Sequence, residues 1–355
     1  MNRSQQLISS CSLKNDEGII IHKPANIFYL SGFTGEGLLI IAKGMLGIVT
    51  DFRYVEQAQQ QAPDYSVHSI SNDVNHAQVA ANMIKGNGIK KILFEDDYVT
   101  VKSYEQLRDA LQPVLLEPLN SAPEAMRTIK DEDEIAAIEK ACAISCEAFD
   151  FVCGVIKPGM TEKEIKCSLD FRMLELGCDR IGFDSIVASG PNGSLPHAIA
   201  GDRKIQPGDM ITLDFGAKYK GYCADMTRTV AVGQPGDLMK TIYGIVQKAQ
   251  EASENALAPG KICRDIDAIA RGMITDAGYG ERFGHGLGHS LGIDIHEDPR
   301  LNPKSQEELK PGHVITVEPG IYLPGVGGVR IENTCLITAS GARSLVSTPR
   351  DLIIL

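Results

Sequence analysis

One short passage of this chain occurs twice, and the repetition restricts the folds that the sequence can adopt. A Pro-Gly dipeptide at residues 207–208 opens a predicted strand that ends on Asp214, and another at residues 311–312 opens one that ends on Glu318. In both copies an isoleucine and a threonine stand three and two positions before the acid. Each copy is therefore predicted to be a strand that follows a tight turn and ends on a carboxylate.

A Gly-rich turn and a second acidic strand follow each copy, with the second acid at Asp225 and at Glu332. Two matched hairpins with two acids each predict a pseudo-twofold site that holds four carboxylates. Neighbours such as Leu213, Val317 and Ile331 are apolar, so we expect these strands to belong to a core. Because an unpaired carboxylate costs several kcal/mol to bury, the pattern predicts two divalent cations among the acids.

The spacing within each hairpin also predicts how its strands pair. In the first hairpin, a tight turn at residues 219–220 would place Asp214 directly opposite Asp225, with Cβ atoms roughly 5 Å apart. In the second hairpin, we expect residues 319–328 to form a Pro/Gly loop that lets the two strands come back together.

The duplication extends beyond the hairpins. A Pro-Gly dipeptide precedes a predicted helix in each half, at residues 158–159 and at residues 259–260. A phenylalanine follows each helix, and we expect Phe183 and Phe283 to lie in strands. Each half thus has the order helix, strand, hairpin, which favours an internal duplication.

The first part of the chain has a different pattern, in which short apolar runs alternate with polar helical stretches, as is typical of an α/β unit. Strands are expected at residues 18–21, 37–41, 46–50 and 91–94, and helices at residues 73–87 and 102–112. Residues 120–123 are expected to be a linker, and the acidic residues 131–134 to open a helix that continues to about residue 153. We therefore expect an α/β (α+β) chain with two domains, residues 1–122 and residues 123–355.

Composition excludes some classes of function. The net charge of −11 argues against a nucleic-acid-binding protein, which would carry a basic surface. No apolar run is long enough to span a bilayer, and the N-terminus has no apolar core of a signal peptide. The nine cysteines are scattered without metal-binding spacing, which is typical of reduced thiols. We therefore expect a cytoplasmic protein with no membrane or nucleic-acid partner.

Histidines supply the remaining site candidates. His285, His289 and His296 lie in a Gly-rich segment, and the first two share a face if the segment is extended. Glycine permits close backbone approach, and imidazole is a common metal ligand, so the segment is predicted to join the acidic site. His197 is either a loop residue or a further residue of that site.

These motifs resemble the Xaa-Pro peptidases of the pita-bread fold, the group that contains aminopeptidase P and prolidase. The resemblance covers the whole chain, including a smaller N-terminal α/β creatinase-like domain that contains residues 50–54. It implies five metal ligands: Asp214, Asp225, His289, Glu318 and Glu332. Creatinase, a more distant relative, lacks such a set, which argues against its reaction. One departure is Ser290, where many relatives have glycine.

The resemblance also implies a role for each ligand. Asp225 and Glu332 would bridge two ions, while Asp214 would bind only one of them. His289 and Glu318 would bind the other ion. Four carboxylates and one imidazole favour a hard or borderline ion, with Mn²⁺ first and Co²⁺, Fe²⁺ or Zn²⁺ as alternatives. Cys223 is interpreted as a small buried hydrophobe rather than a ligand.

Other residues are expected to act on the substrate. The catalytic candidates are His197, His285, His296, Glu318 and Arg330, and the substrate-binding candidates are Tyr322 and Phe183. Glu318 would take a proton from water, and His285 or His296 would stabilise the oxyanion.

The sequence therefore predicts an exopeptidase with two metal ions that removes the residue before a proline at the second position of a peptide. We expect an aminopeptidase, with an Xaa-Pro dipeptidase (prolidase) as the alternative. A dipeptidase must bind the substrate's carboxylate and exclude longer chains. A non-catalytic binding protein on the same fold is a further alternative, which would be expected to lose metal ligands. The resemblance also implies a homodimer, in which Phe52 or its neighbours reach a partner's active site.

Overall fold

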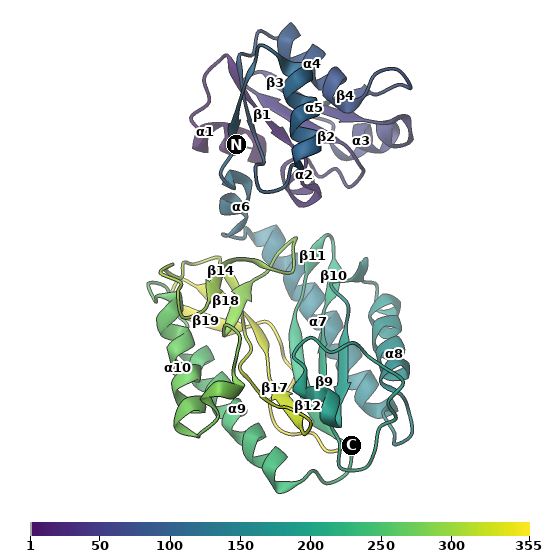
Figure 1. The fold of residues 1–355 in the computed structure, drawn as a ribbon, viewed down its shortest axis with the longest axis vertical. Coiled ribbons are helices and arrows are strands. Elements are labelled where there is room, and N and C mark those ends of the chain that lie inside the picture. The colour runs from purple at the N-terminus through teal and green to yellow at the C-terminus, as the bar shows by residue number, and fades with distance from the viewer. Residues whose placement is uncertain (1) are drawn as a thin grey trace. The chain divides into compact units, whose positions relative to one another are not determined.

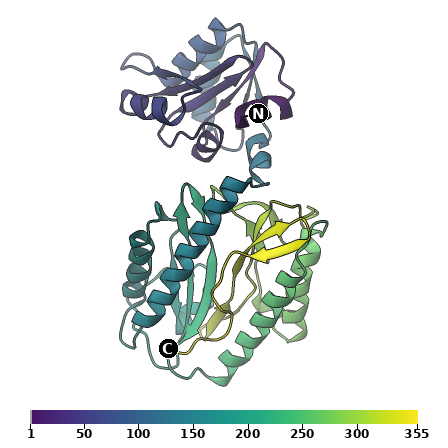
Figure 2. The same ribbon diagram turned by 180° about the vertical axis from the view of Figure 1, so that it is seen from behind.

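The computed structural model describes residues 2–355, and these form two compact units (Figures 1 and 2). The N-terminal unit ends at Arg127, and the C-terminal unit comprises Thr128–Leu355. Among the described residues, no helix has the length and apolar character needed to cross a membrane.

The N-terminal unit is built on a six-stranded mixed sheet with the order β4-β3-β2-β1-β5-β6. Its strands are β1 (Glu17–Ile21), β2 (Leu38–Ala42), β3 (Met45–Thr50), β4 (Ser66–Ser69), β5 (Lys91–Phe94) and β6 (Leu115–Pro118). Its helices are α1 (Arg3–Ser10), α2 (Pro24–Ser31), α3 (Val55–Gln61), α4 (His76–Gly86), α5 (Val101–Leu111) and α6 (Ala122–Arg127). The four predicted strands and two predicted helices are confirmed. The predicted linker is wrong in part, because α6 begins within it.

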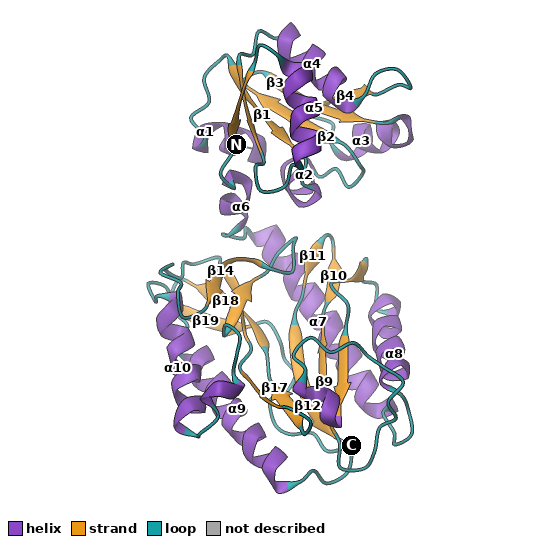
Figure 3. Cartoon of the chain, viewed as in Figure 1, coloured by secondary structure: helices purple, strands orange, loops and turns teal. Residues whose placement is uncertain are grey.

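The C-terminal unit places helices around a set of central strands (Figure 3). Its helices are α7 (Glu132–Val155), α8 (Glu162–Glu175), α9 (Asp237–Asn255) and α10 (Cys263–Asp276). The acidic start predicted for α7 is confirmed: Asp131 caps the helix and three acids occupy its first turn, where the helix dipole favours negative charge. Helices α7 and α8 pack together, as do α9 and α10.

The strands of this unit form several short antiparallel sheets. In the first half they are β7 (Arg180–Ile181), β8 (Ile186–Ser189), β9 (Met210–Phe215), β10 (Ala217–Tyr219), β11 (Tyr222–Cys223) and β12 (Met226–Ala231). In the second half they are β13 (Gly288–Ser290), β14 (Glu297–Leu301), β15 (Val314–Val317), β16 (Gly320–Leu323), β17 (Gly327–Arg330), β18 (Asn333–Thr338) and β19 (Gly341–Ser344). The hairpin of β9 and β12 corresponds to that of β15 and β18.

The helix of each repeat is confirmed, since α8 and α10 follow the two Pro-Gly dipeptides. The strands expected around Phe183 and Phe283 are wrong. Phe183 lies in a bend between β7 and β8, and Phe283 follows the 3₁₀ turn Gly280–Arg282. Arg271 of α10 donates to the Phe283 carbonyl oxygen, and Asp170 of α8 accepts a hydrogen bond from Ser185, two residues after Phe183.

The register predicted for the first hairpin is also wrong. Asp214 pairs with Thr227, not with Asp225, because the turn is centred on Lys220 and Gly221. Both turn residues have left-handed φ values, 47° and 81°, and such two-residue hairpin turns favour glycine at the second position. The turn therefore lies one residue later than predicted. As a result, each residue of β9 pairs with a residue two positions further along the chain than predicted.

In the second hairpin, residues 319–328 do not form a loop. Strands β16 and β17 pair within this segment, from Gly320 with Arg330 to Leu323 with Gly327. The glycines serve close packing instead: a Cβ atom on Gly328 would lie 2.1 Å from the carbonyl oxygen of Gly193. The hairpin therefore continues past the acids and forms one wall of the site.

Candidate functional site

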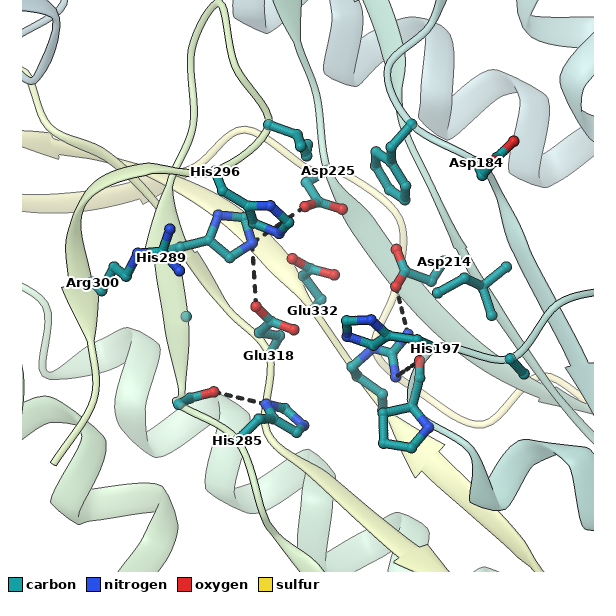
Figure 4. Close-up of a pocket in the computed structure, with 18 of the residues that line it drawn as sticks. Asp184, His197, Asp214, Asp225, His285, His289, His296, Arg300, Glu318 and Glu332 are labelled. Carbon is teal, nitrogen blue, oxygen red and sulfur yellow. Dashed lines mark hydrogen bonds and ion pairs between the residues drawn. The ribbon is translucent and has the colours of Figure 1, made fainter. Parts of the chain in front are cut away.

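The four acids of the two hairpins converge at the centre of the C-terminal unit (Figure 4). Asp214 lies near the end of β9 and Asp225 directly before β12. Glu318 follows β15, and Glu332 lies between β17 and β18. Figure 4 shows His289 and His296 on one side of these acids and His197 on the other. The duplication thus brings residues more than 100 positions apart to one place.

Asp225, His289 and Glu332 form a compact group, with one possible ligand atom from each within 4.8 Å of the others. The Nε2 atom of His289 lies 3.6 Å from an oxygen of Asp225 and 3.4 Å from one of Glu318. Its Nδ1 atom lies 3.0 Å from the Ser290 carbonyl oxygen, which can accept a hydrogen bond only from a protonated Nδ1. This contact leaves the Nε2 lone pair directed at the acids, as a metal ligand requires.

Several buried oxygens of the acids have no hydrogen-bond donor within residues 2–355. One oxygen each of Asp214, Asp225 and Glu332 has no hydrogen-bond partner among the described residues, whereas buried polar atoms in native proteins nearly always have one. Burial and mutual repulsion raise the pKa of Asp225 and of Glu318 well above the usual range, and that of Glu332 to about 8. Carboxylate oxygens without donors, beside a neutral imidazole, fit divalent cations.

A chain of hydrogen bonds supports Asp214. Arg330 donates to a carboxylate oxygen of Asp214 at 2.5 Å and to the hydroxyl oxygen of Tyr322 at 2.9 Å. Because arginine only donates, the Tyr322 hydroxyl directs its own proton to Nε2 of His285, 2.9 Å away. Burial lowers the pKa of His285 to about 4, so the ring is neutral at pH 7, with Nδ1 donating to the Gly286 carbonyl oxygen at 2.8 Å.

This chain changes the interpretation of His285. Both of its ring nitrogens are engaged within the protein, so of the two histidines predicted to stabilise the oxyanion, His296 is the one left as a candidate. The His296 ring packs edge-on against His289, with ring centroids 4.6 Å apart. Burial lowers the pKa of His296 as well.

A cavity of about 610 Å³ lies over the acids. Every side chain that the sequence marked as a site residue lines it: Phe183, His197, Asp214, Asp225, His285, His289, His296, Glu318, Tyr322, Arg330 and Glu332. Cys223 is not among the lining residues, and its thiol lies 3.6 Å from the carbonyl oxygen of Ile293. The placement of these residues agrees with the expected site, while their individual roles stay predictions.

Sequence reasoning missed three polar residues of the cavity wall, Asp184, Arg300 and Asn302. Arg300 could have been suspected, because it stands only four positions after His296. Asp184 carries no such signal beyond its position next to Phe183.

Two family models account for nearly the whole chain. Residues 136–339 match metallopeptidase family M24, and residues 3–129 match the creatinase/prolidase N-terminal domain. The chain belongs to metallopeptidase family M24. This M24 protein is therefore a metallopeptidase with a divalent-metal site, and the pita-bread fold and the creatinase-like N-terminal domain implied by the resemblance are confirmed.

Solved structures and curated relatives resemble this M24 peptidase over its full length. An Xaa-Pro dipeptidase from Bacillus anthracis is 41% identical with a TM-score of 0.95, and 99% of each chain is covered. An X-Pro aminopeptidase from Thermotoga maritima is 35% identical with a TM-score of 0.92 and complete coverage of both chains. An Xaa-Pro dipeptidase of Pyrococcus horikoshii is 36% identical, with 99% of each chain covered.

Proposed function

We propose that this M24 metallopeptidase is an Xaa-Pro dipeptidase with two divalent metal ions. This choice departs from our sequence-based expectation of an aminopeptidase. Two of the three relatives described above are named dipeptidases, including the one with the higher identity and TM-score. Both activities concern the bond before a proline, so the choice depends on how the far end of the substrate is bound.

Arg300 is the observation that favours the dipeptidase. It lies on β14, lines the cavity and keeps about half of its side chain exposed, 3.6 Å from the exposed carboxylate of Asp298. A dipeptide differs from a longer peptide by the free carboxylate on its proline. A guanidinium group matches a carboxylate in charge and in planar geometry, so we infer that Arg300 binds this group.

The ligand set divides into shared and separate residues. Asp225 and Glu332 would hold both ions, with Asp214 on one ion and with His289 and Glu318 on the other. When bound, such a pair of ions acidifies water and polarises a carbonyl group. Mn²⁺ is the ion that we propose first, because oxygen ligands dominate the site.

The remaining residues would handle protons and orientation. Glu318, adjacent to the cavity, would accept the proton of the attacking water. His296 would donate a hydrogen bond to the substrate's carbonyl oxygen as charge develops there. The proline nitrogen has no hydrogen of its own and must gain one as it leaves. We infer that His197, which lies across the acids from His296, would supply it.

Product analysis decides between the two activities. With Mn²⁺ present, we expect the protein to cleave Ala-Pro and to leave Ala-Pro-Ala-Ala intact, as followed by chromatography. Cleavage of the tetrapeptide at a comparable rate would establish the aminopeptidase. Absence of cleavage of either peptide, with or without Mn²⁺, would remove the peptidase proposal altogether.

The role of Arg300 has its own test. Arg300→Gln should raise KM for Ala-Pro by a factor of roughly 10–150, since a hydrogen bond to a charged group contributes about 1.5–3 kcal/mol. The matched control is Ala-Pro amide, which lacks the carboxylate. Its KM should be nearly the same for the wild-type protein and for Arg300→Gln. An equal effect on both substrates would contradict the carboxylate contact.

A further inference from the structure

An ion pair on α10 with a buried carboxylate and a partly exposed guanidinium group contacts the segment that carries His285. Arg271 donates to both oxygens of Asp267, at 2.7 Å and 2.8 Å, and Asp267 is 1% exposed. The same guanidinium group donates to the carbonyl oxygens of Phe283, at 3.1 Å, and of His285, at 2.8 Å. It also stacks on the Phe283 ring, 4.5 Å from the centroid. Asp267 accepts a hydrogen bond from the backbone nitrogen of Leu287 at 3.0 Å.

These contacts replace the hydrogen bonds that a sheet would supply. Residues 283–287 lie between a 3₁₀ turn and β13 and belong to no strand. The pair therefore holds three alternate residues, Phe283, His285 and Leu287, of an irregular segment. On its other side the segment continues to the metal site, since Leu287 accepts a hydrogen bond from the backbone nitrogen of Glu318 at 2.8 Å.

The held segment also begins the hydrogen-bond chain that reaches Asp214. His285 contacts Tyr322, Tyr322 contacts Arg330, and Arg330 contacts Asp214, at 2.9 Å, 2.9 Å and 2.5 Å. Each group in this chain has a single productive orientation, because donors and acceptors alternate along it. A shift of the His285 backbone would break the chain at its first link.

The first half of the molecule anchors its corresponding segment in the same way. On α8, Lys166 and Asp170 stand 101 positions before Asp267 and Arg271 and form an ion pair of 2.8 Å. Asp170 accepts a hydrogen bond at 2.5 Å from Ser185, two residues after Phe183 of the cavity wall. Both repeats thus use an ion pair between positions i and i+4 of their helix, with the order of charges reversed.

We propose that Arg271, held by Asp267, is a positioning residue that fixes His285 and thereby orients Tyr322 and Arg330 at the active site. Arg271 is not among the described residues that line the cavity, and its hydrogen bonds go to Asp267, Phe283 and His285 rather than to the predicted metal ligands. The expected effect on turnover rests on the proposed function. The expected effect on the His285 ring does not.

Arg271→Lys is the variant that isolates this role. Lysine can keep the ion pair with Asp267. A single ammonium group cannot reproduce the arginine's planar set of donors, which reaches both Asp267 oxygens and two backbone carbonyl oxygens. We expect kcat on Ala-Pro to fall on the order of ten- to a hundred-fold, because a small misplacement of active-site groups has effects of this size. KM should change by less than about three-fold, since the substrate contacts remain.

The matched control is Arg264→Lys. This arginine is on the same helix and pairs with Asp265 at 3.2 Å, but both side chains are well exposed. The same substitution there should leave kcat and the thermal unfolding temperature unchanged. If Arg271→Lys lowers activity only as far as it lowers unfolding temperature or metal content, the proposal is wrong.

The His285 ring provides a readout that does not depend on activity. The protein is loaded with Zn²⁺, which is diamagnetic, and the imidazole ¹⁵N signals of its eight histidines are recorded. The His285 signals are assigned from the spectrum of His285→Asn. We expect Arg271→Lys to shift them toward a mixture of tautomers, as the contacts to Gly286 and Tyr322 weaken.

Unchanged His285 signals in Arg271→Lys would overturn the positioning role, whatever the activity. If the wild-type protein cleaves no Xaa-Pro dipeptide, the proposed function fails, and the His285 signals still decide whether Arg271 positions this ring. The two failures are therefore distinguishable.

Discussion

At the scale of single residues, Asp225 shows most directly what the site requires. Its side chain is almost fully buried, one of its oxygens has no donor among the described residues, and burial and nearby acids raise its pKa. An isolated carboxylate in such a place is unfavourable. A cation shared with Glu332 would remove this penalty for both acids at once.

Asp225→Asn should therefore impair the binding of both ions. We expect the affinity for the metal ions to fall on the order of 100-fold or more. Even a residue that only hydrogen-bonds to a metal ligand contributes about 10–100-fold to metal affinity. Metal content after dialysis, measured by mass spectrometry, checks this. Asp184→Asn is the matched control, because Asp184 lines the same cavity with a fully exposed side chain. Two tightly held ions in Asp225→Asn would contradict a bridging role.

At the scale of elements, a buried ion pair connects the start of α7 to the strands beside the site. Lys130 contacts Glu297 of β14 at 3.1 Å and the hydroxyl of Ser290 at 3.2 Å. Both charged side chains are at least nine-tenths buried. Glu297 follows His296 and Ser290 follows His289, so the pair joins the backbones of both histidines.

Lys130→Met should destabilise the protein by about 3–5 kcal/mol, because it removes the cation that pairs with the buried Glu297 charge. The double variant Lys130→Met with Glu297→Met should recover much of this loss. Chemical denaturation gives both values. The control is Lys163→Met, which breaks an exposed pair with Asp202 and should cost no more than about 1 kcal/mol. Equal losses at the two lysines would show that burial of the pair is unimportant.

The two hairpins also make the metal-free protein sensitive to pH. The pKa of Glu332 is raised to about 8, so the folded chain keeps a proton that the unfolded chain has lost above its usual pKa near 4.5. The protonated Glu332 therefore stabilises the folded chain at low pH, and this stabilisation is lost as the pH rises towards 8. The pKa values of His285 and His289, lowered to about 4, act in the opposite direction, but only below about 6.5.

Between pH 6.5 and 8.5, the unfolding temperature of the protein in EDTA should therefore fall as pH rises. With saturating Mn²⁺ the fall should disappear, because metal binding favours ionised carboxylates. Each kcal/mol lost from the free energy of unfolding should lower the unfolding temperature by roughly 2–4 °C. Glu332→Gln should flatten the curve in EDTA, and Glu281→Gln, at an exposed position, should not. A curve that is flat in the wild-type protein would mean that the acids do not share a repulsive site.

At the scale of the whole molecule, the homodimer remains a prediction. Phe52 is 82% exposed on the N-terminal unit, which is unusual for an aromatic side chain of this size. Light scattering should give a mass of about twice 38.4 kDa. Phe52→Ser should lower turnover, whereas Tyr98→Ser, at another exposed aromatic position of the unit, should not. A single-chain mass at all concentrations, or normal turnover in Phe52→Ser, would argue against a shared site.

The sequence by itself determined most of the predicted elements and the residue types of the site. The helices after the Pro-Gly dipeptides, the capped start of α7 and the acids at the strand ends follow from signals that act over a few residues. The four carboxylates and the histidines of the Gly-rich segment were predicted to share a site, and all of them line one cavity.

Only the tertiary structure decided which atoms meet. The pairing of Asp214 with Thr227 depends on a turn one residue away from the predicted one, and the engagement of both His285 nitrogens depends on Tyr322. Arg271 reaches its carbonyl oxygens only because α10 packs beside a segment without a strand. Contacts between distant residues depend on packing and on hydrogen-bond geometry, and neither is encoded in local patterns of the sequence.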